Sequence, residues 1–319
     1  MILAIVLFII GLACLIFGGD WFVDGASGLA YRFKIPEIIV GATVVSIGTT
    51  LPEVMVSATS AAQGLGDMSY GNAIGSIICN TALILALALA IRPAPVDKKS
   101  LFTPTLFFMI SAIFYMVVAY ACGFFSRWMG IVLLLIFVLF MIITVRQGFK
   151  NPDRTQTPEH KQWPLWREIL FLILGAALIA VGARLLVDNG TKIAEMIGVP
   201  DSVIALTFVA LGTSLPELVT AVVSLAKGHG ALSLGNIVGA NLFNLVLVSG
   251  LSITIRPFAV PVEKLFLGHN ASFVIDLPLM FLAMAFVTIP ALIRGKLSRV
   301  QGIILLVLYA AYVTFQFAF

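Results

Sequence analysis

Two motifs in the first half of the chain, GATVVSIGTTLPE (41–53) and GNAIGSIICN (71–80), return in the second half. Their copies are ALTFVALGTSLPE (205–217) and GNIVGANLFN (235–244), and both pairs are offset by 164 residues. Self-similarity at a fixed offset marks a chain built from structural repeats, so these four segments should occupy equivalent places in two related halves.

The match extends well beyond the motifs, because Pro36–Pro93 falls on Pro200–Pro257 without a gap. An ungapped match of this length indicates an internal duplication. We therefore predict two repeats, 1–146 and 167–319, joined by a linker over 147–166 that is too short to be a domain.

The composition restricts the chain to one class of protein. Of the 319 residues, 61% are hydrophobic and 11% are charged, whereas soluble domains carry about 25% charged residues. This composition excludes a soluble enzyme, a nucleic-acid-binding protein and a disordered chain, and favours an all-α polytopic membrane protein.

The three cysteines form no CxxC motif, and the three histidines lie far apart in predicted loops, where we interpret them as solvated. Neither group indicates a metal site or a disulfide framework.

Charges and Gly/Pro breaks divide the chain into ten apolar spans of roughly 20 residues each, long enough to cross a bilayer. We expect the first to be a transmembrane span and not a cleaved signal peptide, because it lacks a basic amino-terminal region and its apolar stretch continues past the usual length. We predict the spans at 2–29, 37–63, 70–91, 101–121, 128–146, 167–190, 201–226, 232–255, 271–293 and 300–318.

Each repeat holds five spans, an odd number, so the second repeat should be inverted in the membrane relative to the first. Inverted repeats of this kind build secondary transporters, whose substrate site lies near the bilayer midplane at the repeat interface. The inverted duplication therefore favours a secondary transporter.

The basic residues set the expected orientation. With the amino terminus outside, 14 lysines and arginines fall in inner segments and 5 at outer ends, in keeping with the positive-inside rule. We therefore predict a multi-pass protein of the plasma (inner) membrane, with both termini outside and the linker in the cytoplasm.

The first motif places a proline near the middle of an apolar span in each repeat, at Pro52 and Pro216. Because proline lacks an N–H and clashes with the preceding turn, each should break its helix and free carbonyls around Thr49 and Thr213. Exposed backbone is tolerated at this depth only where it is buried in protein or lines a cavity. Freed carbonyls are hard oxygen ligands suited to Na⁺ and Ca²⁺.

An acidic residue follows each proline, Glu53 after Pro52 and Glu217 after Pro216. Thr50-x-x-Glu53, like Ser214-x-x-Glu217, is also typical of a capping box at a helix start. A carboxylate near the midplane costs at least about 2.5–3.5 kcal/mol, which a capping Asn or Ser would avoid. We therefore favour cation ligation, with capping geometry as part of the site.

The second motif places small residues four apart, and both GxxxG pairs should allow neighbouring helices to approach closely. Ser76 and Asn80 share one helix face, which close packing would bring against the broken helix. Asn80 and its equivalent Asn244 join the two glutamates in an oxygen cluster. Interhelical hydrogen bonding alone remains an alternative for these asparagines, and more so for Asn72 and Asn236.

The predicted cluster contains neither His nor Cys, which favours Ca²⁺, Mg²⁺ or alkali cations over zinc or copper. Two carboxylates neutralise one Ca²⁺ or two Na⁺, so these ions could compete for one cavity.

The paired motifs resemble the α-repeats of the sodium/calcium exchangers in the cation/calcium antiporter superfamily, short prokaryotic type. The resemblance implies ten helices in two inverted halves and alternating access, with the first and sixth spans sliding across the other eight. It implies transport of Na⁺ and Ca²⁺, with no cofactor and no obligate protein partner. At the positions that match the family motifs, the resemblance implies that Ca²⁺ is held by Glu53, Glu217, Thr49 and Thr213. Na⁺ would use these groups together with the backbone carbonyls of Ser46 and Ala210 and the hydroxyls of Thr50, Ser76 and Ser214. The side chains of Asn80 and Asn244 would complete the centre.

Two positions depart from the pattern of the short members, which often have an acid where Asn244 stands and a serine where Ala240 stands.

Three other function classes make different demands on the chain. A H⁺/Ca²⁺ antiporter is an alternative, because a midplane glutamate can carry a proton. A passive channel usually needs filter rings from several chains. An intramembrane hydrolase would need a nucleophile with a base, and no membrane-buried His or Lys is expected.

Overall fold

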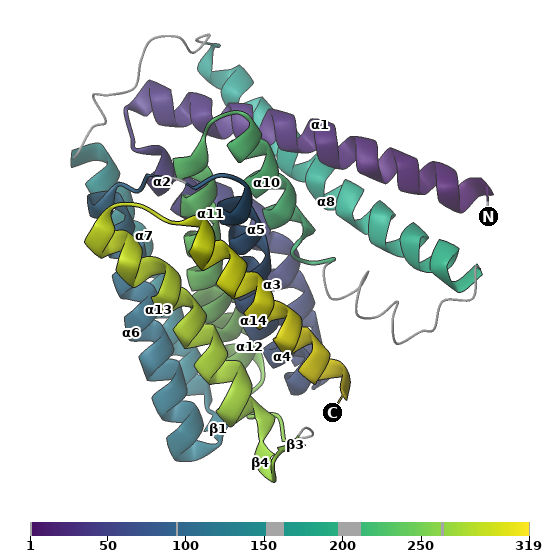
Figure 1. Cartoon of the computed structure of the whole chain (residues 1–319), viewed down its shortest axis with the longest axis vertical. Helices are drawn as coiled ribbons and strands as arrows, with labels where there is room; N and C mark the ends of the chain where they lie inside the picture. Colours follow the sequence, from purple (N-terminus) through teal and green to yellow (C-terminus); the bar gives the residue numbers. More distant parts are fainter. Residues whose placement is uncertain (1, 94, 151–162, 197–211, 263–264, 319) are drawn as a thin grey trace.

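The computed structural model describes residues 2–93, 95–150, 163–196, 212–262 and 265–318, and it is almost entirely helical (Figure 1). The α-helices are α1 (Ile2–Phe33), α2 (Glu37–Val40), α3 (Ser46–Gln63), α4 (Gly66–Cys79), α5 (Ala86–Ile91), α6 (Lys98–Cys122), α7 (Arg127–Lys150), α8 (Leu165–Met196), α10 (Leu215–Ala226), α11 (Gly230–Phe243), α12 (Ser249–Ile255), α13 (Leu277–Arg294) and α14 (Arg299–Ala318). Wider π-helical turns join several of them: η1 (Gly41–Val45), η2 (Asn80–Leu85), η4 (Asn244–Val248) and η5 (Ser272–Asp276).

Short strands that the sequence analysis did not predict occur in the loops at one end of the bundle. β1 (Phe124–Phe125) pairs antiparallel with β2 (Phe258–Ala259), and β3 (Leu265–Phe266) with β4 (His269–Asn270). The first pair joins the loop after α6 in the first repeat to the loop after α12 in the second.

The predicted spans agree with the helices in order and, within a few residues, in bounds. Among the described residues, nine helical segments are long and apolar enough to cross a membrane, and Leu215–Ala226 is a shorter apolar helix. The span predicted at 201–226 is described only from residue 212 onward. The all-α, ten-helix membrane fold is thereby confirmed.

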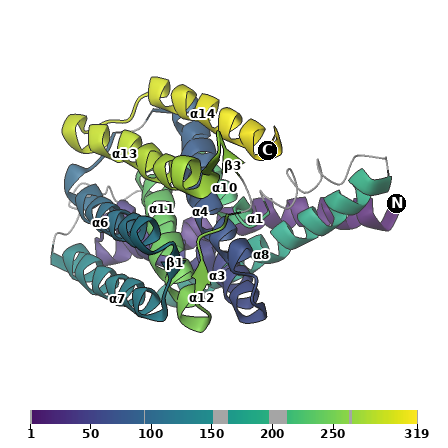
Figure 2. The same cartoon turned by 90° about the horizontal axis from the view of Figure 1, so that it is seen from below.

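Helices α1 and α8 form an antiparallel pair that extends away from the other helices (Figures 1 and 2). Glycines bring the two backbones together along their length: a Cβ at Gly18 would lie 2.9 Å from the Ile179 N, and one at Gly25 would lie 2.6 Å from the Glu168 O. Small residues allow close helix packing where apolar side chains gain nothing by leaving lipid. The pair therefore forms one unit.

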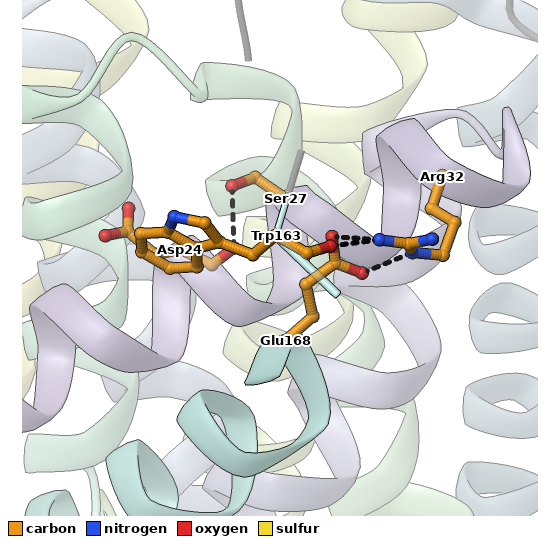
Figure 3. A network of polar contacts seen from close by, with 5 residues as sticks. All are labelled: Asp24, Ser27, Arg32, Trp163 and Glu168. Carbon is orange, nitrogen blue, oxygen red and sulfur yellow. Dashed lines mark hydrogen bonds and ion pairs between the residues drawn. The ribbon is translucent and has the colours of Figure 1, made fainter. Parts of the chain in front are cut away.

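Ion pairs connect α1 to its neighbours near one end of the bundle. Arg32 on α1 reaches Glu168 on α8 with two nitrogens, at 2.7 and 3.0 Å (Figure 3). Lys227, which follows α10, lies 2.6 Å from Asp20 and 2.5 Å from Asp24. These two aspartates therefore join α1 to the residue that follows α10.

The most deeply buried spans are α4–η2–α5 and α11–η4–α12, the equivalent segments of the two repeats. Helices α6, α7, α13 and α14 lie on two sides of them (Figure 2). Large apolar side chains that are fully buried fill the contacts, among them Phe108, Tyr115, Phe125, Phe140 and Phe243.

The prediction that both GxxxG pairs mediate close packing holds for one of them. A Cβ at Gly235 would lie 2.2 Å from the Ile38 O, and one at Gly239 would lie 2.4 Å from Ser46 Oγ. At Gly71 and Gly75, by contrast, no described atom would lie within 4 Å of an added Cβ. The expectation is wrong for the first repeat because these two glycines line a cavity instead of a helix contact.

The interpretation of all three histidines as solvated is also wrong for one of them. His229 Nδ1 lies 2.7 Å from Glu37 Oε1, and both side chains are largely covered. This contact links the starts of α11 and α2. His160 lies outside the described residues, and His269 is exposed.

Candidate cation site

Four polar side chains lie at equivalent places in the two repeats, in the interior of the bundle. Glu53 is in the middle of α3, and Glu217 is in the first turn of α10. Asn80 and Asn244 each begin a π-helical turn, where the α-helix widens. All four are 0% exposed. Single π-helical turns within α-helices are frequent at functional sites.

The two repeats build this cluster together. The turn η2, which Asn80 begins, contacts α10, and η4, which Asn244 begins, contacts α3. Each asparagine therefore lies on an element that packs against the glutamate-bearing helix of the other repeat. The Glu53 and Glu217 carboxyl groups are close enough to repel each other when both are charged.

The polar atoms of this cluster are buried without hydrogen-bond partners among the described residues. They are both carboxyl oxygens of Glu53 and Glu217, both amide atoms of Asn80 and Asn244, Thr50 Oγ1 and Ser214 Oγ. The large majority of buried side-chain polar atoms normally have a partner, so a concentration of exceptions needs a physical cause. Removing a carboxylate from water costs several kcal/mol even after relaxation, which a bound cation would offset.

The threonines of the first motif face the opposite repeat. Thr49 and Thr50 lie near the Glu217 carboxyl group. The Thr49 hydroxyl is 3.2 Å from Asn236 Oδ1, while Ser46 Oγ lies 2.8 Å from the Gly41 O and 3.0 Å from the Asn236 O. The Ser46 hydroxyl is thus occupied by these hydrogen bonds, so the group of Ser46 that could bind a cation is its backbone carbonyl.

Asn236 orients the first motif, although it was not among the residues predicted for the site. Its repeat equivalent Asn72 behaves differently and donates to Ser57 Oγ at 2.8 Å and to the Glu53 O at 3.2 Å, within its own repeat. The alternative of interhelical hydrogen bonding therefore describes these two asparagines. The duplicated GN dipeptide was the signal for both, but it did not indicate which helix each would contact.

The two prolines act differently, contrary to the prediction that both break their helices. Helix α3 runs without interruption from Ser46 to Gln63 through Pro52. Pro52 still removes the amide that the Gly48 carbonyl would accept from, four residues earlier. In the second repeat, residues 212–214 form a turn and α10 begins at Leu215, so Pro216 lies in the first turn of a new helix.

The predicted capping boxes are not formed. Thr50 lies inside α3, and Ser214 precedes α10 without a side-chain hydrogen bond to its backbone. Both hydroxyls are instead buried without partners in the described part of the chain, next to the glutamates. Capping therefore does not explain either Ser/Thr-x-x-Glu pattern.

The remaining predicted residues differ in how far the structure describes them. Ser76 is 5% exposed and precedes Asn80 by one turn of α4. Thr213 is partly exposed in the turn before α10. Ala240, the equivalent of Ser76, is fully buried. Ala210 lies outside the described residues.

Comparison with known proteins identifies the family of this bundle. A family model described as "Sodium/calcium exchanger protein" matches residues 3–146 and 167–318, almost the whole chain. The chain belongs to the sodium/calcium exchanger family. Members of this family are membrane transporters, so the protein is a transporter and not an enzyme.

Individual family members are similar over most of their length. The inner membrane protein YrbG of Escherichia coli K12 is 40% identical over 270 residues, covering 81% of each chain. The sodium/calcium exchanger MaX1 of Methanosarcina acetivorans is 28% identical, covering 97% of each chain. The solved structure of the sodium-calcium exchanger NCX_Mj is 32% identical, covers 98% of both chains and superposes with a TM-score of 0.83. This chain therefore has the fold of a solved exchanger over nearly all of its residues.

Proposed function

We propose that this protein exchanges Na⁺ for Ca²⁺ across the membrane by alternating access. The observation that carries the proposal is the cluster of buried carboxyl, amide and hydroxyl oxygens that lack partners among the described residues, contributed by both repeats. Oxygen-only ligand sets suit Ca²⁺ and alkali cations. The names of the related exchangers MaX1 and NCX_Mj are in keeping with the proposal.

In this proposal the two carboxylates set the charge of the site. Glu53 and Glu217 together balance one Ca²⁺ or two Na⁺, so the ions compete for one cavity. Thr49 and Thr213 add ligands to Ca²⁺, while Na⁺ uses the neutral groups around the centre. Those groups are the carbonyls of Ser46 and Ala210, the hydroxyls of Thr50, Ser76 and Ser214, and the amides of Asn80 and Asn244.

The helix pair α1 and α8 supplies a candidate moving unit for alternating access. Its two helices meet along a row of glycines that includes Gly18 and Gly25, here called the glycine seam. They contact each other far more extensively than they contact the other helices. The Lys227 contacts with Asp20 and Asp24 join the pair to α10. We propose that these contacts hold the pair in one of its two positions, with the linker end of the bundle facing the cytoplasm.

The proposal is tested by Ca²⁺ uptake into proteoliposomes loaded with Na⁺. Uptake should require the outward Na⁺ gradient, and Glu53→Gln and Glu217→Gln should each abolish it, since each removes half of the balancing charge. Glu37→Gln makes the same chemical change at the end of the bundle and should retain exchange.

Three results would contradict the proposal. Near-normal uptake by either glutamate variant would remove that residue from the site. Uptake driven by a proton gradient instead of a Na⁺ gradient would indicate a H⁺/Ca²⁺ antiporter. Uptake without any counter-ion would indicate a channel.

A further inference from the structure

A cavity of about 280 Å³ lies beside the first half of α4, at the end of the bundle that carries both strand pairs. Its walls come from α4, from Pro261, Ala271 and η5, and from the last turns of α14. A water occupies about 30 Å³, so the cavity has room for a cation with its inner hydration shell. Gly71 and Gly75 line it and keep it open, since side chains there would fill it.

Oxygen-bearing side chains line this cavity. Asp276 accepts a hydrogen bond of 3.1 Å from Gln316 Nε2, and Tyr312 lies beside the same carboxylate. Asp67 lines the cavity from an exposed position. Among the described lining residues there is no Lys, Arg, His or Cys. Such a set provides negative charge and hard oxygen ligands only, which selects for Ca²⁺-like or alkali cations.

Tyr70 gives an independent indication of a ligand. Its side chain is 4% exposed, it lines the cavity, and its hydroxyl has no hydrogen-bond partner within the described part of the chain. The ring is held by stacking on Phe125, with centroids 6.3 Å apart. A buried Tyr hydroxyl usually finds a partner, so this one is poised to meet a ligand in the cavity.

The opposite wall is preformed. Asn270 Nδ2 donates to the Pro261 O at 2.9 Å, and the Ser272 N donates to Asn270 Oδ1, also at 2.9 Å. These bonds fix the loop that leads into η5 and therefore the position of Asp276. Sites held by such supporting bonds keep their geometry when a ligand binds.

The cavity is separate from the duplicated site. The 164-residue offset places Ala231 and Leu234 at the positions of Asp67 and Tyr70, so the polar residues that α4 contributes have no polar counterparts at the equivalent positions of the second repeat. It adjoins the central cluster nevertheless, because Asn80 follows Gly75 by about 7.5 Å of helix rise.

We infer that this cavity is a second, peripheral cation site, in which Asp276, Tyr70 and Tyr312 hold a partly hydrated Ca²⁺-like ion, with Asp67 at its mouth. A carboxylate-lined cavity with low-dielectric walls concentrates cations. The site therefore supplies ions to the central cluster, a role that rests on the proposed exchange function. Ion binding itself does not depend on exchange.

Binding is tested with Tb³⁺, a Ca²⁺ substitute whose luminescence is excited through nearby tyrosines. The protein is the full chain carrying Glu53→Gln and Glu217→Gln, so that the central carboxylates are absent. We expect a saturable signal that Ca²⁺ displaces. Adding Asp276→Asn, which keeps the shape of the side chain, should weaken Tb³⁺ binding on the order of tenfold, because affinity follows the charge of the ligands.

Two control variants make the test specific. Asp276→Glu restores the charge and should retain binding, and Asp188→Asn removes a carboxylate that is 55% exposed on α8 and should change nothing. Absence of a saturable signal, or a signal that Asp276→Asn leaves unchanged, would overturn the inference, even if exchange itself proceeds as proposed.

A second measurement addresses the role in transport. In the otherwise unaltered protein, Asp276→Asn should raise the half-saturating Ca²⁺ concentration several-fold and leave the maximal exchange rate unchanged. A reduced maximal rate with an unchanged half-saturating concentration would contradict the assigned role in ion supply. Because Tb³⁺ binding is measured without exchange, failure of the proposed function and failure of this inference are distinguishable.

Discussion

At the residue scale, the duplicated positions carry different side chains where the two halves of the site meet. Ser76 and Ala240 are equivalent, and both are buried. The first repeat can therefore offer two hydroxyls, from Thr50 and Ser76, whereas the second offers Ser214. With amides and no acid at Asn80 and Asn244, neutral oxygens must do more of the Na⁺ selection.

Ala240→Ser should restore a ligand in the second repeat and lower the Na⁺ concentration needed for half-maximal exchange. The Ca²⁺ affinity should change less, because both glutamates remain. The measurement is the Na⁺ dependence of Ca²⁺ flux in proteoliposomes.

The matched variant for this comparison is Ser76→Ala, which removes the equivalent hydroxyl and should raise the Na⁺ requirement. If Ser76→Ala has this effect while Ala240→Ser has none, the side chain at position 240 only packs and the difference between the repeats has no role in Na⁺ selection.

At the scale of the elements, equivalent glycines meet different surroundings. In α11, an added Cβ at Gly239 would lie 2.4 Å from Ser46 Oγ and 2.6 Å from the Ala42 Cα. At Gly75 in α4, no described atom would lie within 4 Å. The same substitution therefore tests close packing in one repeat and open space in the other.

Gly239→Ala should destabilise the protein by about 1–3 kcal/mol, because the neighbouring backbone must shift to admit the methyl group. Gly75→Ala should be neutral or stabilising by about 0.5–1 kcal/mol, the helix-propensity difference between the two residues. Thermal unfolding in detergent measures both. Equal losses of Tm would show that the helices approach equally closely in both repeats.

The contact between α1 and α10 gives a second prediction at this scale. Lys227→Met removes the charge that holds Asp20 and Asp24 and should shift the position of the α1–α8 pair, since losing contacts of one state favours the other. Hydrogen exchange should increase in α1 around these aspartates.

The control is Asp188→Asn, which breaks the exposed ion pair with Arg184 on α8. It should leave the rate of hydrogen exchange in α1 unchanged. Unchanged protection of α1 in Lys227→Met would mean that the glycine seam alone fixes the pair.

At the scale of the whole molecule, the predicted orientation is open to a direct test. In a background without Cys14, Cys79 and Cys122, a cysteine replacing Gln156 should react with an impermeant thiol reagent only from the cytoplasmic side. A cysteine replacing the exposed Asp67 should react only from outside. The reverse pattern would exchange the inner and outer labels of every loop.

The sequence by itself determined the duplication, the membrane class, the order of the spans and the family, because a fixed offset and long apolar runs can be read along one dimension. It also pointed to Glu53, Glu217, Asn80 and Asn244, since a polar group at membrane depth is costly and is retained chiefly where it has a function. The helical period predicted that Ser76 and Asn80 share a face.

Only the tertiary structure decided which elements those faces meet. Asn236 contacts the first repeat while Asn72 stays within it, α3 continues through Pro52, and one GxxxG pair packs while the other lines a cavity beside Asp276. The physical reason is that periodicity fixes the direction of a side chain around its own helix axis and carries no information about the helix opposite. Two related repeats, inverted against each other, therefore place equivalent residues in different surroundings.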